Sequence, residues 1–103
     1  MRLEIHDEAA GEIQRHHEWY ERRDPRVAAR LADLFEATAV QVAINPLQFS
    51  LMEMPGNPGN IRRARLKGFP LYILYRVKED EVQIIAVPHT SQRPEYWRSR
   101  LLD

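Results

Sequence analysis

The chain has 103 residues and no cysteine, so we expect one domain over residues 1–103 and exclude a disulfide framework and a thiolate metal site. The formal net charge is zero, and no apolar run approaches the roughly 18 residues that a membrane-spanning helix needs. The N-terminal segment MRLEIHDEAA lacks the apolar stretch of a signal peptide, so we expect a soluble, cytoplasmic protein.

Charge is unevenly distributed along the chain. Residues 1–60 carry six Lys/Arg against ten Asp/Glu, a net charge of −4, and residues 61–103 carry nine against five, a net charge of +4. This asymmetry indicates either an anionic partner for the second half or attraction between the two halves.

The first half of the chain predicts a short strand followed by two helices. Residues 2–5 alternate polar and apolar side chains, as strands do. A helix over residues 8–22 follows, with Asp7 as its expected N-cap. Asp24-Pro25 begins a second helix, which should end near residue 44 because Asn45-Pro46 disfavours helical backbone. The connection is short, so the helices should form an antiparallel hairpin.

The second half predicts a loop and then a basic strand. Prolines and glycines mark residues 46–60 as the loop. From Arg62 the pattern has a period of two, which places alternate side chains on opposite faces. The cations Arg63, Arg65 and Lys67 should share one face, opposite Ala64 and Leu66.

Two further strands and a terminal helix complete the pattern. Residues 71–77 form a strand with Leu71, Ile73, Tyr75 and Val77 on one face, and a polar turn leads to a strand over 82–88. The latter is apolar on both faces, so it should be central in the sheet. Arg93-Pro94-Glu95 resembles a helix start.

The predicted fold class is therefore α+β, with the order β-α-α-β-β-β-α. It comprises an N-terminal strand, an antiparallel two-helix hairpin, a three-stranded antiparallel meander and a short C-terminal helix. The N-terminal strand should pair with the last strand. The residues expected in the core are Leu31, Phe35, Ile73, Tyr75 and Ile84.

No motif for a metal or cofactor is present, and none is expected. His16 and His17 are adjacent, so their side chains diverge by about 100° on a helix and cannot chelate one ion together. The Pro/Gly-rich loop lacks the lysine and helix of a phosphate-binding loop, and no serine lies in a nucleophile elbow.

Cations, one histidine and aromatic side chains near the end of the sheet are the candidate site. They are Arg63, Arg65, Lys67, Arg76, His89, Arg93, Tyr96 and Trp97. Such a set can bind phosphates and stack on bases, or perform acid–base chemistry on RNA. The alternative is a solvated sheet face, with Tyr96 and Trp97 packing the terminal helix on the core.

The chain resembles the ParE/RelE superfamily of toxins from type II toxin–antitoxin modules over nearly its whole length. Three segments carry the resemblance: the helix DEAAGEIQRHHEWYE, the basic and aromatic strands RRARLKGFPLYILYRV, and the last strand and tail VQIIAVPHTSQRPEYWRSR. Phe69-Pro70 and the Arg93-Pro94…Trp97 tail favour the ParE branch. The resemblance implies a toxin silenced by an antitoxin; ParE toxins poison DNA gyrase, and RelE toxins cleave messenger RNA on the ribosome.

The match to the RelE nucleases is uneven. Tyr72 stands where they have an arginine, and Thr90-Ser91 stands near their second arginine. Arginine's fixed charge and fork geometry are hard to replace, so nuclease chemistry is the weaker expectation.

The first hypothesis is therefore a ParE-like gyrase inhibitor without turnover of its own. The second is a ribosome-dependent messenger RNA endonuclease using Arg65, Lys67, His89, Arg93 and Tyr96. The third is a degenerate member that retains only antitoxin binding. The residues expected to bind target or antitoxin are Arg63, Arg65, Lys67, Arg76, Arg93, Trp97, Arg98 and Arg100. The expected partners are a cognate antitoxin in a possible hetero-oligomer and gyrase, or alternatively the ribosome and messenger RNA. DNA would be contacted only indirectly, through the antitoxin.

Overall fold

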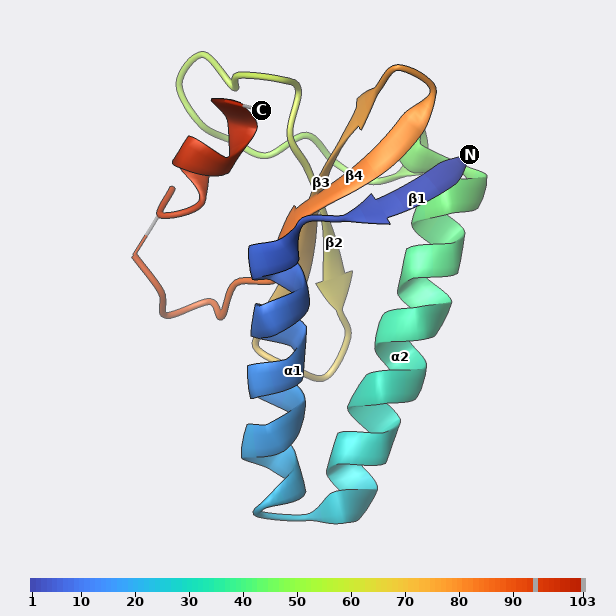
Figure 1. Ribbon diagram of the computed structural model, residues 1–103, viewed down its shortest axis with the longest axis vertical. Helices are drawn as coiled ribbons and strands as arrows, with labels where there is room; N and C mark the ends of the chain where they lie inside the picture. The colour runs from blue at the N-terminus through green and yellow to red at the C-terminus, as the bar shows by residue number, and fades with distance from the viewer. Residues whose placement is uncertain (94, 103) are drawn as a thin grey trace.

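The computed structural model describes residues 1–93 and 95–102 and has two helices against a four-stranded sheet (Figure 1). In chain order the elements are β1 (Arg2–Ile5), α1 (Asp7–Glu21), α2 (Pro25–Ile44), a 3₁₀ turn (Pro46–Gln48), β2 (Arg62–Leu66), β3 (Leu71–Lys78), β4 (Glu81–Ala86) and a C-terminal 3₁₀ helix (Arg98–Leu102). The predicted α+β class and element order are confirmed.

The sheet has the order β1-β4-β3-β2, so β4 lies inside it, as its two apolar faces predicted. β2, β3 and β4 form the antiparallel meander, and β1 pairs with β4 as expected. The β1–β4 pairing is parallel, however, so the sheet is mixed rather than wholly antiparallel. The β3–β4 turn is tight because Glu79 and Asp80 both adopt positive φ, the backbone of a type I′ hairpin turn.

Helix α2 begins where the sequence predicted. The Asp24 side chain accepts a hydrogen bond from the backbone N–H of Arg26, and Pro25 occupies the first turn. Helix α1 differs from the prediction, because its N-cap is His6, whose Nδ1 accepts from the N–H of Glu8. Asp7 is the first helical residue and not the cap, although its charge still suits the positive end of the helix.

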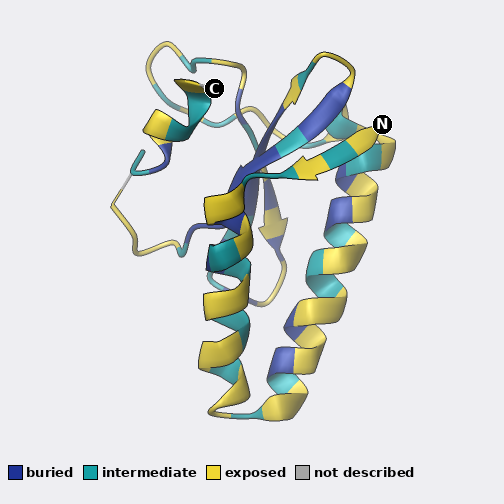
Figure 2. Cartoon of the chain, in the orientation of Figure 1, coloured by how far each residue is buried: buried dark blue, intermediate teal, exposed yellow. Residues whose placement is uncertain are grey.

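The main core lies between the helices and the sheet (Figure 2). Leu31, Ile73, Tyr75 and Ile84 are buried there, as predicted. Phe35 is only partly buried, because it lies at the edge of the cluster beside two surface hollows. Val77 shares the face of Tyr75 but is 39% exposed, since it lies near the end of β3, beyond the helices.

A second cluster covers part of the other sheet face, which the helices leave free. Ile61, Leu74, Ile85 and Ala86 pack there with Trp97. The loop before β2 and the C-terminal segment lie side by side over this cluster (Figure 1). Residues 95–102 are called the tail below; they end in a 3₁₀ helix rather than the helix expected from residue 93, and Pro94 of that predicted start lies outside the described residues.

Candidate functional site

Three of the predicted binding residues lie together on the helix-free face of the sheet. Arg63 and Arg65 are exposed on β2 and Lys67 follows it, while Ala64 and Leu66 point into the core. The alternation follows from the two-residue period of a strand. The predicted basic strand face is therefore present.

These cations line a groove of about 690 Å³, whose other walls include Phe49, Ser50, Tyr72 and Thr90; we call it the basic groove. Arg65 pairs in register with Tyr72 across the β2–β3 ladder. The guanidinium carbon of Arg63 lies 5.8 Å from the centre of the Tyr72 ring. The groove thus combines positive charge with an aromatic side chain, a combination suited to anions that carry a planar group.

Three other predicted binding residues hold the tail on the sheet. Trp97 is only 1% exposed and packs in the second cluster. Arg76 is buried and donates to the side chain of Gln83 and to the carbonyl of Leu101. Arg100 donates to the carbonyl of Ile85 at 3.0 Å. All three have an evident role within the fold.

A buried ion pair anchors the same tail to α1. Arg100 donates to Oε2 of Glu12 at 2.7 Å, and Oε1 of Glu12 accepts from the N–H of Val87 at 2.9 Å. Burial would raise the pKa of Glu12, but the hydrogen bonds from Arg100 and Val87 outweigh it and lower that pKa. Glu12 was not among the predicted functional residues. The feature of the sequence that indicates it is its position three residues after Ala9 and four before His16, on the side of the helix expected to be buried.

The five residues that a nuclease would use are divided among separate places. Arg65 and Lys67 line the basic groove, whereas His89 lines a neighbouring pocket of about 320 Å³, which shares Leu71 with the groove. Nδ1 of His89 lies 2.7 Å from the Ser91 hydroxyl.

The remaining two are Tyr96 and Arg93. The Tyr96 hydroxyl is buried without a well-formed hydrogen bond, and burial together with the nearby Glu12 charge raises its pKa. Arg93 is exposed, as is Arg98, which pairs with Glu95 in the tail. Neither His89 nor Tyr96 therefore lines the groove that holds Arg65 and Lys67; the phenol that does line it belongs to Tyr72.

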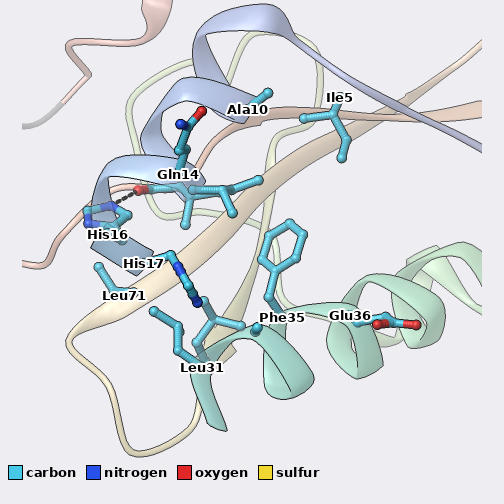
Figure 3. A pocket seen from close by; sticks show the side chains of 13 residues that line it. Ile5, Ala10, Gln14, His16, His17, Leu31, Phe35, Glu36 and Leu71 are labelled. Carbon is cyan, nitrogen blue, oxygen red and sulfur yellow. Dashed lines mark hydrogen bonds between the residues drawn. The ribbon is translucent and has the colours of Figure 1, made fainter. Parts of the chain in front are cut away.

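An apolar surface lies on the opposite side of the molecule, between the helices. A hollow of about 490 Å³ is lined by Ile5, Ile13, Leu31 and Phe35, and Figure 3 shows His17 of α1 facing Leu31 and Phe35 of α2 across it. A second hollow of about 540 Å³ shares Phe35 and continues over Val40 and Ile44, of which 49% and 69% are exposed. We call the two hollows together the apolar trough. The feature of the sequence that indicates the apolar trough is the stripe of apolar side chains on α2, which is wider than the face of the helix that one sheet can cover.

The two adjacent histidines have separate positions, as their spacing predicted. His16 donates from Nε2 to the carbonyl of Val87 at 2.7 Å and so ties α1 to the end of β4. His17 lies at the apolar trough. Within residues 1–93 and 95–102, no group of three or more His, Cys, Asp or Glu side chains is placed to hold a metal ion. None of the described helices is long and apolar enough to cross a membrane.

Comparison with known proteins agrees with this architecture. Residues 3–94 match a family described as the ParE toxin of the type II toxin–antitoxin system, parDE. A solved structure described as the chromosomal ParDE TA system from P. aeruginosa has 22% sequence identity and a TM-score of 0.71, over 86% of this chain and 95% of that chain, which is a likeness of fold. No curated protein matches the sequence. Because the family match spans most of its length, the chain belongs to the ParE toxin family of type II toxin–antitoxin systems.

Proposed function

We propose that the chain is a toxin that binds and inhibits DNA gyrase in the cytoplasm and has no bond-breaking activity of its own. The observation that carries this choice over RNA cleavage is that neither His89 nor Tyr96 lines the basic groove that holds Arg65 and Lys67. His89 lies in a pocket other than the basic groove, and the hydroxyl of Tyr96 is buried against the Glu12 region. General acid–base catalysis requires such groups within hydrogen-bond reach of the substrate.

Membership of the family supports a cognate antitoxin as the second partner. The apolar trough suits an amphipathic antitoxin segment, because apolar side chains from both helices remain uncovered there. Val40 and Ile44 are the exposed anchors of this surface. A segment that covers them would remove apolar area from water, the largest contribution that a helix-in-groove contact supplies.

Two assays on the purified chain test the proposed target. The expected result is inhibition of gyrase supercoiling with accumulation of double-strand breaks, and no cleavage of messages translated in a cell-free system. Tyr96→Phe and His89→Ala should both retain gyrase inhibition. Tyr96→Phe is the cleaner variant, because the hydroxyl that it removes has no well-formed hydrogen bond to lose.

Message cleavage by the wild type with gyrase unaffected would overturn the proposal in favour of the nuclease. Under that mechanism His89→Ala and Tyr96→Phe should each reduce the rate by about 10²–10⁴-fold. Inactivity in both assays, with antitoxin binding retained, would identify a degenerate member of the family.

The antitoxin contact is tested separately by co-expression with the protein encoded beside the gene. Val40→Glu should weaken co-purification, because it places a charge in the apolar surface that the antitoxin segment would cover. Arg30→Glu, at an exposed position earlier on the same helix, is the control and should leave co-purification intact. Equal capture of both variants would show that the antitoxin does not use the apolar trough.

A further inference from the structure

Among the described residues, the side chains of the groove cations have no hydrogen bond or ion pair, whereas every other arginine of the sheet and tail is held by one or the other. Arg2 pairs with Glu81, Arg98 with Glu95, and Arg100 with Glu12. Within the described residues, Arg63, Arg65 and Lys67 form no ion pair, and no carboxylate lines the groove around them. The fold therefore does not require this positive charge for its own stability.

The spacing of these cations suits a linear polyanion. Residues two apart on a strand are separated by about 6.6 Å, so Arg63, Arg65 and Lys67 form a row of positive charge along β2 and just beyond its end. The row follows one wall of an open groove and does not converge on one point. An extended chain of phosphates fits this arrangement better than a single compact anion.

The groove also offers a stacking surface. Tyr72 is half-buried and its hydroxyl-bearing ring belongs to the groove wall beside Arg63. Ser50 and Thr90 supply hydroxyl donors from the two loops that border the groove. Basic grooves with aromatic platforms are the common means of holding single-stranded nucleic acid without sequence preference.

An acidic peptide added as a further strand fits less well. Half of the outer edge of β2 is already occupied, because Leu51 pairs with Arg62 and the N–H of Arg63 donates to the carbonyl of Ser50. The N–H of Met52 also donates to the carbonyl of Ile61 just before the strand. The backbone groups that strand addition needs are therefore taken along this part of the edge.

We propose that the basic groove binds single-stranded nucleic acid through its phosphates, with a base stacked on Tyr72. This differs from the expectation that DNA is contacted only through the antitoxin. It also goes beyond gyrase inhibition, which can hold or fail independently. Binding occurs without cleavage, because no imidazole or carboxylate lies among the described side chains of the groove.

Fluorescence anisotropy with labelled dT12 and U12 oligonucleotides, over a series of salt concentrations, tests this directly. Each phosphate contact on a single strand contributes about −0.7 to the slope of the logarithm of the binding constant against the logarithm of the salt concentration. Three contacts therefore predict a slope near −2. Arg65→Gln should bring the slope to about −1.4, and Tyr72→Leu should weaken binding about tenfold at unchanged slope. The oligonucleotides should be recovered intact.

Arg30→Gln is the matched control, since it removes one exposed arginine from α2 and should leave affinity and slope unchanged. Absence of binding by the wild type would overturn the proposal, as would equal loss for Arg30→Gln and Arg65→Gln. An Arg65-dependent preference for a poly-glutamate peptide over both oligonucleotides would also overturn it and identify a peptide site. Supercoiling assays on the same variants distinguish this proposal from the proposed function. Gyrase inhibition without oligonucleotide binding would overturn only the proposal that the basic groove binds single-stranded nucleic acid.

Discussion

Replacing Arg100 with methionine should lower the free energy of unfolding by about 3–5 kcal/mol at neutral pH, because it breaks a buried ion pair. Arg100 donates to Glu12 at 2.7 Å and to the carbonyl of Ile85 at 3.0 Å, and it lies 3.0 Å from a carboxylate oxygen of Glu8. The unpaired Glu12 carboxylate, which is 8% exposed, accounts for most of the loss. The Glu8 contact contributes less, because the Glu8 side chain is 64% exposed.

The same variant should change how stability depends on pH. In the wild type, the lowered pKa of Glu12 means that its contribution is present above the unfolded value of 4.5 and is lost as the pH falls further. Without Arg100, burial is opposed mainly by the N–H of Val87, so the pKa of Glu12 should rise. The loss caused by Arg100→Met should therefore be largest near pH 7 and should shrink as the pH falls and Glu12 becomes protonated.

Urea unfolding followed by tryptophan fluorescence measures these differences, since Trp97 is buried and its carbonyl accepts a hydrogen bond from the backbone N–H of Arg100. Arg98→Met is the matched control; its surface pair with Glu95 should be worth less than about 1 kcal/mol. The double variant Glu12→Met/Arg100→Met should recover much of the loss, because no unpaired charge remains buried. A loss below about 1 kcal/mol for Arg100→Met, or one that does not vary with pH, would refute the reasoning.

Three further substitutions test other parts of the fold by the same unfolding measurement. Phe35→Ala should cost about 1–2 kcal/mol, less than the 3–5 kcal/mol typical of a fully buried phenylalanine, because the ring is only partly buried; a loss above about 3 kcal/mol would contradict its position at the edge of the core. Asn57→Ala should cost about 2 kcal/mol, since that side chain bonds Met52 and Ile61 and holds the loop before β2, and a neutral result would remove this role. The hydrogen bond from Arg2 lowers the pKa of Glu81 from 4.5 to about 2, so the stabilisation that this pair supplies is present above pH 4.5 and is lost between pH 4.5 and 2. Arg2→Gln should therefore reduce the free energy of unfolding above pH 4.5 and weaken its dependence on pH between 4.5 and 2. An unchanged dependence on pH would exclude the pair as its cause.

Local sequence chemistry was sufficient to predict most of the elements. Asp24-Pro25 and Asn45-Pro46 mark the two ends of α2, because a capping residue or a proline acts on the backbone within one helical turn of its own position. The alternation of Ala64 and Leu66 with cations placed β2 correctly, since a strand separates its two faces at every residue. These predictions needed no knowledge of distant partners.

Predictions that depended on distant neighbours were less accurate. Val77 lies near the end of β3, beyond the helices, and Phe35 lies on α2 at the edge of the core cluster. How far packed elements cover one another is a tertiary property, which a local pattern does not contain. The same holds for the site. The sequence indicated Arg63, Arg65 and Lys67. It could not show that Arg100 pairs with the carboxylate of Glu12, which lies 88 residues away on α1. The cap of α1 was misplaced by one residue, because histidine competes there with aspartate as an acceptor.

The parallel pairing of β1 with β4 has a consequence for synthesis of the chain. Arg2 and Glu81, which lie opposite each other in the ladder, are 79 residues apart, so β1 has no strand to join until β4 has been made. Contacts of such long range form late and slowly, after the local helical hairpin. Until then the apolar sides of α1 and α2 have no sheet to cover them, which is the state in which a nascent chain is most open to aggregation or capture. A ribosome-bound fragment that stops before β4 should therefore contain the hairpin but lack the closed sheet, and with it the tail's docking surface. The toxin fold would therefore become complete only after β4 and the tail have been made.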